Sequence, residues 1–131
     1  MNQSELKKKL QRVVKKVLAF ENKIGYSASV VFVSRAKIQE LNRVYRKKNR
    51  PTDVLSFGQD GADEKYIGEI ILCLPYIREQ AKEYGVTYLE ELTRMTIHGT
   101  LHLLGYDHIR AMDRRRMLPR QEKYLSTPGV L

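Results

Sequence analysis

Apolar residues in the first twenty positions recur at intervals of three and four. This spacing places them on one face of a helix and leaves lysines and arginines on the other face. Ser4 is expected to cap this helix, which we expect to end at about Phe20. The face directed toward a core consists of Leu6, Leu10, Val13, Val14 and Val17.

The remainder of the chain alternates between short runs rich in β-branched residues and segments with helical periodicity. The runs predict strands at 26–33, 54–57 and 67–73. The periodic segments predict helices at 35–46, 75–84 and 88–104. Strands interspersed with helices in this way indicate a small mixed β-sheet packed by helices.

The predicted boundaries depend on a few capping residues. Ser34 and Thr87 precede helices and are expected to cap them, the latter in a capping box with Glu90. Gly85 and Gly105 follow helices and are expected to end them through left-handed turns. In the helix at 35–46, the residues expected to face inward are Ile38, Leu41 and either Val44 or Tyr45.

Length, cysteine content and charge narrow the class of protein. The 131 residues suffice for a single domain over 1–131 that buries a core without disulfides, and Cys73 has no cysteine partner. No segment resembles a signal peptide or a membrane span, so a cytoplasmic protein is expected. The formal net charge of +9 favours a polyanionic partner such as RNA, although an excess of solvated lysine is also common in small basic proteins.

All three histidines lie within eleven residues, at positions 98, 102 and 108. Residues four apart on a helix project from the same face, so His98 and His102 can reach one metal ion together. Gly105 allows the chain to reverse and bring His108 back as a third ligand. Three histidines leave one tetrahedral position open, which is typical of a catalytic zinc ion. A lone pair of helical histidines would more often be structural; the third histidine favours the metal site.

The spacing also matches the zinc-protease pattern H-E-x-x-H-x-x-G-x-x-H in all but one residue. Gly99 stands where those proteases place a glutamate that acts as general base. Without that carboxylate, protease chemistry by the same route is disfavoured. Glu69 is a candidate base, although a glutamate on a strand is more often structural. Asp107 is a candidate acceptor that orients a ligand imidazole.

At this point the sequence resembles a known family. HGTLHLLGYDH is similar to the H-G-x-L-H-L-x-G-Y-D-H signature of the YbeY family, bacterial metal-dependent endoribonucleases of ribosomal RNA maturation. LNRVYRKKNRPTDVLSF resembles a second block of that family, and Gly68-Glu69-Ile70 a third. The resemblance extends from about Glu40 to His108.

The resemblance implies a zincin-like α+β domain with its metal-site helix at about 88–104. It implies that His98, His102 and His108 bind one Zn²⁺ ion or another divalent transition metal, and that His98 and Arg46 are catalytic. A guanidinium at position 46 can hold a phosphodiester bidentately. By its position alone, Arg46 would be a solvated cation at a helix end.

The C-terminal segment departs from the family pattern. Many members carry acidic residues after the third histidine, whereas this chain has Arg114, Arg115 and Arg116, interpreted as a phosphate-binding patch or a solvated face. Pro119 is expected to kink or restart the last helix.

Three functions remain open from the sequence. The first is a zinc-dependent endoribonuclease specific for single strands, with the small ribosomal subunit and its assembly factors as partners. The second is a non-catalytic, zinc-containing RNA-binding factor of ribosome assembly. The third is a metallopeptidase, which Gly99 disfavours.

Overall fold

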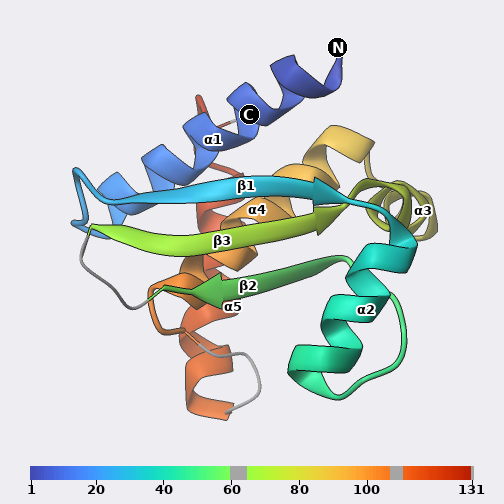
Figure 1. Ribbon diagram of the computed structural model, residues 1–131. Helices are drawn as coiled ribbons and strands as arrows, with labels where there is room; N and C mark the ends of the chain where they lie inside the picture. The colour runs from blue at the N-terminus through green and yellow to red at the C-terminus, as the bar shows by residue number, and fades with distance from the viewer. Residues whose placement is uncertain (60–64, 107–110, 131) are drawn as a thin grey trace.

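The structure is a computed structural model that describes residues 1–59, 65–106 and 111–130, with the backbone alone described for 111–116. Within these residues, a three-stranded sheet is combined with helices on both of its faces (Figure 1). The elements are α1 (Gln3–Phe20), β1 (Ser27–Val33), α2 (Arg35–Arg46), β2 (Val54–Gly58), β3 (Tyr66–Cys73), α3 (Leu74–Tyr84), α4 (Tyr88–Leu103) and α5 (Ala111–Leu125).

The sheet has the strand order β1-β3-β2 and is mixed. β1 runs parallel to β3, with Val30 opposite Ile70, whereas β2 runs antiparallel to β3, with Leu55 opposite Ile71. β2 therefore forms one edge of the sheet. The α+β class and the small mixed sheet packed by helices are confirmed, while the likeness to zincins stays a prediction.

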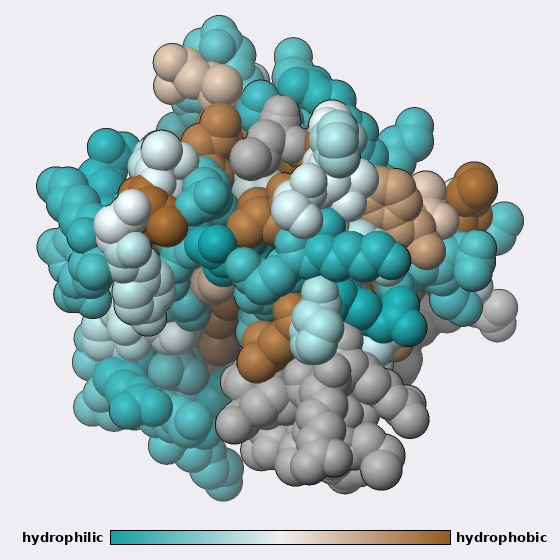
Figure 2. Space-filling view, turned by 180° about the vertical axis from the view of Figure 1, so that it is seen from behind, coloured by the Kyte–Doolittle hydropathy of each residue, from teal (hydrophilic) through white to brown (hydrophobic). Residues whose placement is uncertain are grey.

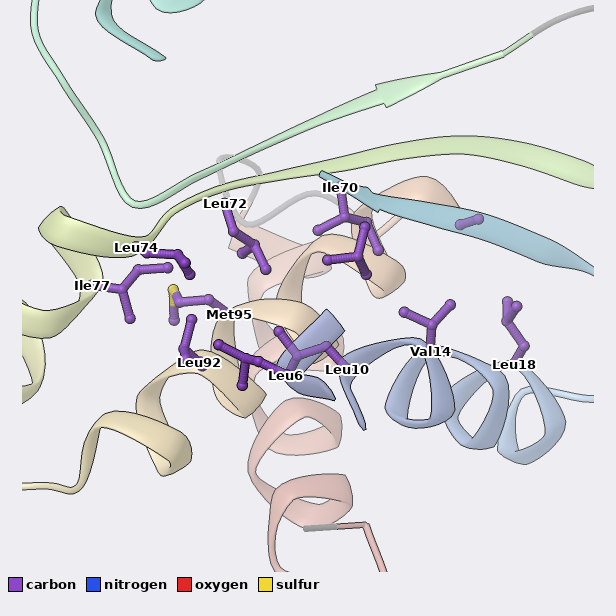
Figure 3. Packing of buried hydrophobic residues seen from close by; sticks show 12 residues of the cluster. Leu6, Leu10, Val14, Leu18, Ile70, Leu72, Leu74, Ile77, Leu92 and Met95 are labelled. Atoms are coloured by element: carbon purple, nitrogen blue, oxygen red, sulfur yellow. The ribbon is translucent and has the colours of Figure 1, made fainter. Parts of the chain in front are cut away.

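The main core lies between the sheet and the helices α1, α3 and α4. Side chains from all of these elements meet there, as Figure 3 shows for Leu10, Leu72 and Leu92, none of which is exposed. A second cluster joins α1 and α4 to α5 and includes Met117. On the opposite face of the sheet, Ile38 of α2 packs against residues of β2 and β3. α4 is consequently packed on several sides, which holds its position relative to β2.

Several predicted caps are confirmed. The side chains of Ser34 and Thr87 accept hydrogen bonds from the backbone N–H groups of Lys37 and Glu90, each at 3.1 Å. Gly85 ends α3 with a φ of 68°. Gly105, just after α4, has a φ of 101°. Both glycines therefore adopt the positive φ angles that favour glycine.

The predicted cap of the first helix is wrong. Asn2 is the capping residue, and its side-chain oxygen accepts a hydrogen bond of 2.8 Å from the N–H of Glu5. Ser4 lies inside α1. Asparagine caps helices as well as serine does, so the helix begins at the earlier of the two available caps.

The inward face predicted for the end of α2 is also wrong. Val44 and Tyr45 are 50% and 61% exposed, and the buried residue of this turn is Asn42, at 3%. Its amide donates a 2.9 Å hydrogen bond to the carbonyl of Arg50. The buried residue of this turn therefore packs against the loop that follows α2, and Val44 and Tyr45 do not point into the core.

Pro119 lies within α5, which is one continuous helix, so the predicted restart is wrong. The side chains of Met117, Gln121 and Tyr124 are buried on both sides of the proline. Met117 and Tyr124 pack with residues of α1 and α4. This burial offsets the hydrogen bond that proline cannot donate.

The chain's last described residues pack beside α1 (Figure 1). Val130 is buried in the same cluster as Val13 and Val17, and Lys16 donates a hydrogen bond to the carbonyl of Gly129. Among the residues that the structure describes, no helix has the length and apolar character needed to cross a membrane.

Candidate active site

A pocket of about 510 Å³ lies between the edge strand β2, the end of α2 and helix α4. We call it the β2 pocket. It brings together side chains from two of the three family-like blocks, the one that contains Arg46 and the one that contains the histidines. Its lining residues are Asn42, Arg46, Lys48, Arg50, Thr52, Asp53, Val54, Leu55, Ser56, Met95, His98 and His102.

His98 and His102 both line this pocket from α4. Their ring centroids are 4.8 Å apart and their planes meet at 61°. The side-by-side placement predicted from the four-residue spacing is therefore present. His108 and Asp107 lie outside the described residues.

The two described candidate ligands, His98 and His102, fit a zinc-type ion. Two neutral imidazoles on successive helical turns can bind one ion, and zinc accepts nitrogen ligands readily. No group of three His, Cys, Asp or Glu side chains that could hold a metal exists within the described ranges, which do not include His108. The three-histidine site thus stays a prediction that depends on His108.

The Nδ1 of His98 lies 2.7 Å from the side-chain oxygen of Gln121 on α5. An amide oxygen can only accept, so Nδ1 carries the proton in this hydrogen bond. Gln121 is 5% exposed. No local pattern in the sequence indicated a role for Gln121, because its contact with His98 spans 23 residues and depends on how α5 packs on α4.

Arg46 enters the β2 pocket from the last turn of α2. Its Nη2 donates a 2.8 Å hydrogen bond to the carbonyl of Ser56, and its guanidinium lies 4.9 Å from the ring centre of Phe57. These two contacts with β2 hold the side chain against the sheet edge. Arg46 and the two histidines therefore line one pocket, although they belong to distant parts of the sequence.

Ser56 also connects β2 to α4. Its hydroxyl donates a 3.1 Å hydrogen bond to the carbonyl of Gly99, one residue after His98. Through its carbonyl and its hydroxyl, Ser56 contacts both Arg46 and the histidine helix. Nothing in the sequence pattern indicated this role, because it depends on how α4 packs on the sheet.

Glu69, the candidate base, does not line the β2 pocket. It is exposed on β3 and lies opposite Phe57 in the register with β2. Its neighbour Ile70 packs in the core toward α4. Because adjacent strand residues face opposite sides of the sheet, Glu69 faces away from α4.

A partly buried network of charged and amide groups adjoins the pocket, and we call it the Arg94 network. Arg94 donates to Glu91 at 2.7 Å and to Glu122 at 3.0 Å. Gln80 donates to Glu91 at 2.7 Å and to Asp53, which lines the pocket, at 3.0 Å. Burial lowers the pKa of Arg94, but hydrogen bonds and charge from the two glutamates outweigh it, and the net shift is upward.

Glu21 binds side chains from the turn after α4 and from α5. The hydroxyl of Tyr106 donates to its carboxylate at 2.8 Å, as does the guanidinium of Arg120 at 2.9 Å, and Tyr124 donates a third hydrogen bond. Burial raises the pKa of Glu21, but these partners together lower it below its ordinary value. The bond from Tyr106 connects the turn after α4 to Glu21 at the end of α1.

The face of the molecule opposite to the view of Figure 1 is covered mainly by hydrophilic side chains, with small separate apolar areas (Figure 2). The side chains of Arg114, Arg115 and Arg116 lie outside the described part, so the interpretation of this run as a patch stays a prediction. Lys48 and Arg50 are the described cations that line the β2 pocket beside Arg46.

Comparisons with known proteins agree along nearly the whole chain. The family model described as Endoribonuclease YbeY matches residues 1–129. The protein named Endoribonuclease YbeY from Bacillus cereus is 38% identical over 133 residues, which cover 92% of this chain and 85% of the relative. The one from Carboxydothermus hydrogenoformans is 45% identical over 103 residues, which cover 78% and 72% of the two chains.

A solved structure is also similar. The solution structure of TM1509 from Thermotoga maritima has a TM-score of 0.66 and 35% sequence identity. The match covers 95% of this chain and 82% of the other. The fold is therefore shared with a solved protein along nearly the whole of this chain.

Proposed function

The chain belongs to the YbeY family of endoribonucleases, and on this basis we propose that it hydrolyses phosphodiester bonds of single-stranded RNA in the β2 pocket. The observation that carries the proposal is the convergence of Arg46, His98 and His102 on that pocket. The pocket's volume is in the range of small-ligand sites. A pocket of this size favours a short stretch of unpaired RNA as the substrate.

His98, His102 and His108 would hold a Zn²⁺ ion or another divalent transition metal. When bound, such an ion supplies Lewis acidity and lowers the pKa of a water ligand to about 7. The hydrogen bond from His98 Nδ1 to Gln121 keeps the proton on Nδ1, so Nε2 is the nitrogen that would bind the ion. Among the described residues, Asp53 is the one carboxylate that lines the pocket and could act as a general base. Its carboxylate already accepts a hydrogen bond from Gln80.

Arg46 would bind and orient the scissile phosphate. Its contacts with Ser56 and Phe57 fix the guanidinium beside the histidines before substrate arrives. A pre-positioned guanidinium stabilises negative charge as it develops on the phosphoryl oxygens. Lys48 and Arg50 would neutralise the phosphates on either side.

We further propose that the natural substrate is ribosomal RNA of the small subunit, acted on during maturation and quality control, with the subunit and its assembly factors as partners. The support is the family membership and the formal net charge of +9. Such a charge favours binding to RNA through release of counterions.

The test uses purified protein of measured metal content and an end-labelled RNA, presented once as a single strand and once annealed to its complement. We expect cleavage of the single strand alone, loss of cleavage with a chelator, and recovery when zinc is added back. His102→Ala should lose both the metal and the activity.

Cleavage that persists unchanged in His98→Ala and His102→Ala would belong to a contaminating nuclease. A fully zinc-loaded protein that binds RNA and never cleaves it would contradict the enzyme and favour the assembly-factor reading.

A further inference from the structure

The hydrogen bond between His98 and Gln121 joins two helices and contacts the predicted metal site directly. At 2.7 Å it is short, and Gln121 is buried. A side-chain amide can present either its oxygen or its NH₂ group to a neighbour, with opposite consequences for the imidazole. The surroundings of the amide therefore decide what His98 can do.

The amide orientation follows from its second partner. Nε2 of Gln121 donates to a carboxylate oxygen of Glu122 at 3.2 Å. With the amide reversed, its oxygen would face that carboxylate, acceptor against acceptor, and its NH₂ group would face Nδ1 of His98. The carboxylate of Glu122 thus directs the Gln121 oxygen toward the imidazole.

The carboxylate of Glu122 is itself held in place by Arg94. Nε of Arg94 donates to it at 3.0 Å and Nη2 at 3.3 Å, and the same guanidinium donates to the buried Glu91. A guanidinium bound to two carboxylates keeps a fixed plane. Arg94 thus orients Glu122, and Glu122 orients the amide of Gln121. That amide in turn faces His98.

The consequence concerns the tautomer of His98. A neutral imidazole carries one proton, and the Gln121 oxygen keeps it on Nδ1. Nε2 is then unprotonated, which is the form that binds a metal. In the other tautomer Nε2 carries the proton and cannot be a ligand.

We propose that Gln121 is a positioning residue that fixes the Nδ1–H tautomer of His98 and thereby sets the affinity of the site for zinc, with Glu122 and Arg94 orienting its amide. The zinc part of this inference rests on the proposed function, whereas the tautomer is a property of the metal-free protein. Partners of this kind typically change metal affinity by about 10- to 100-fold.

The experiment compares the full-length chain with Gln121→Met, which keeps the length of the side chain and removes the acceptor. Ring ¹⁵N chemical shifts of the metal-free proteins report which nitrogen of His98 is protonated. Titration with zinc alone reports the dissociation constant. We expect Nδ1–H in the parent, a shift toward Nε2–H in Gln121→Met, and zinc affinity lower by about 10- to 100-fold.

Two further variants distinguish a specific effect of Gln121 on His98 from a general loss of packing around the site. Gln121→Glu keeps an acceptor and should retain the Nδ1–H tautomer. Gln80→Met removes an amide from the same Arg94 network without touching His98, so it should leave the tautomer and the zinc affinity unchanged. If Gln121→Met does not fold, Glu122→Gln at a half-exposed position tests the orientation step instead, with a smaller shift in the same direction.

An Nε2–H tautomer in the parent protein would overturn the inference, as would equal effects of Gln121→Met and Gln80→Met. Tight zinc binding that Gln121→Met leaves unchanged would overturn it while the proposed function stands. If the tautomer and the zinc affinities are as expected but the protein does not cleave RNA, the inference about Gln121 stands and the proposed function fails.

Discussion

Gly99 lies directly against Ile70, so closely that a Cβ atom at position 99 would be 2.7 Å from Cγ2 of the isoleucine. Ile70 is fully buried, so it can give way only by displacing its neighbours in the core. The hydroxyl of Ser56 would be 3.0 Å from the same Cβ. The histidine helix can therefore approach the sheet only with glycine here, and the glutamate of zinc proteases has no room at this position.

Gly99→Ala is expected to destabilise the protein by roughly 1–2 kcal/mol. Overpacking of a core costs about 1–3 kcal/mol, and the better helix propensity of alanine returns up to about 1 kcal/mol. Urea unfolding measures the difference. Gly58→Ala is the matched control, because its Cβ would have no heavy atom nearer than 3.9 Å. Equal stability of Gly99→Ala and the parent would show that the helix can shift away from the sheet.

Arg46→Ala is expected to lower the rate of RNA cleavage by about 10²–10³, the usual cost of losing one positioned donor to a developing oxyanion. Arg46→Lys should recover only part of the cleavage rate, because an ammonium group cannot replace the two parallel N–H donors of a planar guanidinium. Zinc content should not change. Arg43→Ala, in the same helical turn but outside the β2 pocket, is the control.

The rate constants decide between two roles for Arg46. If Arg46→Ala weakens RNA binding and cleavage by the same small factor, the residue positions the substrate without stabilising the transition state. A loss in kcat with unchanged RNA affinity supports the catalytic role. Unchanged cleavage would exclude both roles.

Glu21 is expected to make stability depend on pH at the acid end. Its pKa is lowered in the folded protein, because hydrogen bonds from Tyr124 and Tyr106 and the charge of Arg120 outweigh the effect of burial. Its contribution is therefore complete above the unfolded-state pKa of about 4.5 and is lost as the pH falls through the folded-state pKa.

Glu21→Gln should lower the free energy of unfolding at pH 7 by about 1.5–3 kcal/mol, the typical value of hydrogen bonds to a charged group. The difference from the parent should shrink as the pH is lowered below about 4.5. Chemical unfolding at several pH values measures it. Glu40→Gln removes an exposed pair with Lys37 and should change stability little. A difference that is constant with pH would contradict the assignment to Glu21.

RNA affinity is expected to fall as salt rises, because cationic side chains release counterions from the phosphates. If the run at 114–116 binds RNA, replacing Arg114, Arg115 and Arg116 by alanine should reduce the slope of log K against log salt by about 2, at roughly 0.7 per contact for a single strand. Fluorescence anisotropy with a labelled single-stranded RNA measures the slope.

The control for the arginine run removes the same charge elsewhere. Lys8, Arg12 and Lys15 are exposed on α1, which packs beside β1 at the edge of the sheet opposite to β2. Their replacement by alanine should alter the slope less. Equal slopes for both triple variants would mean that only the net charge matters.

The sequence by itself determined what depends on near neighbours along the chain. The four-residue spacing of His98 and His102 was enough to place both imidazoles on one face of α4, because the helix fixes their relative direction. The caps at Ser34, Thr87 and Gly85 were equally local. The family-like blocks identified the group of proteins, although no periodicity could have shown that two of them line one pocket.

Tertiary packing decided everything that joins distant segments. It set Arg46 against Ser56 beside the histidines, turned Glu69 to the other face of the sheet, and brought Gln121 to His98. It also kept α5 continuous through Pro119. These outcomes depend on how closely α4 approaches the sheet and how α5 docks on α4. Such distances follow from the combined volumes of buried side chains across the fold, which no local stretch of sequence encodes.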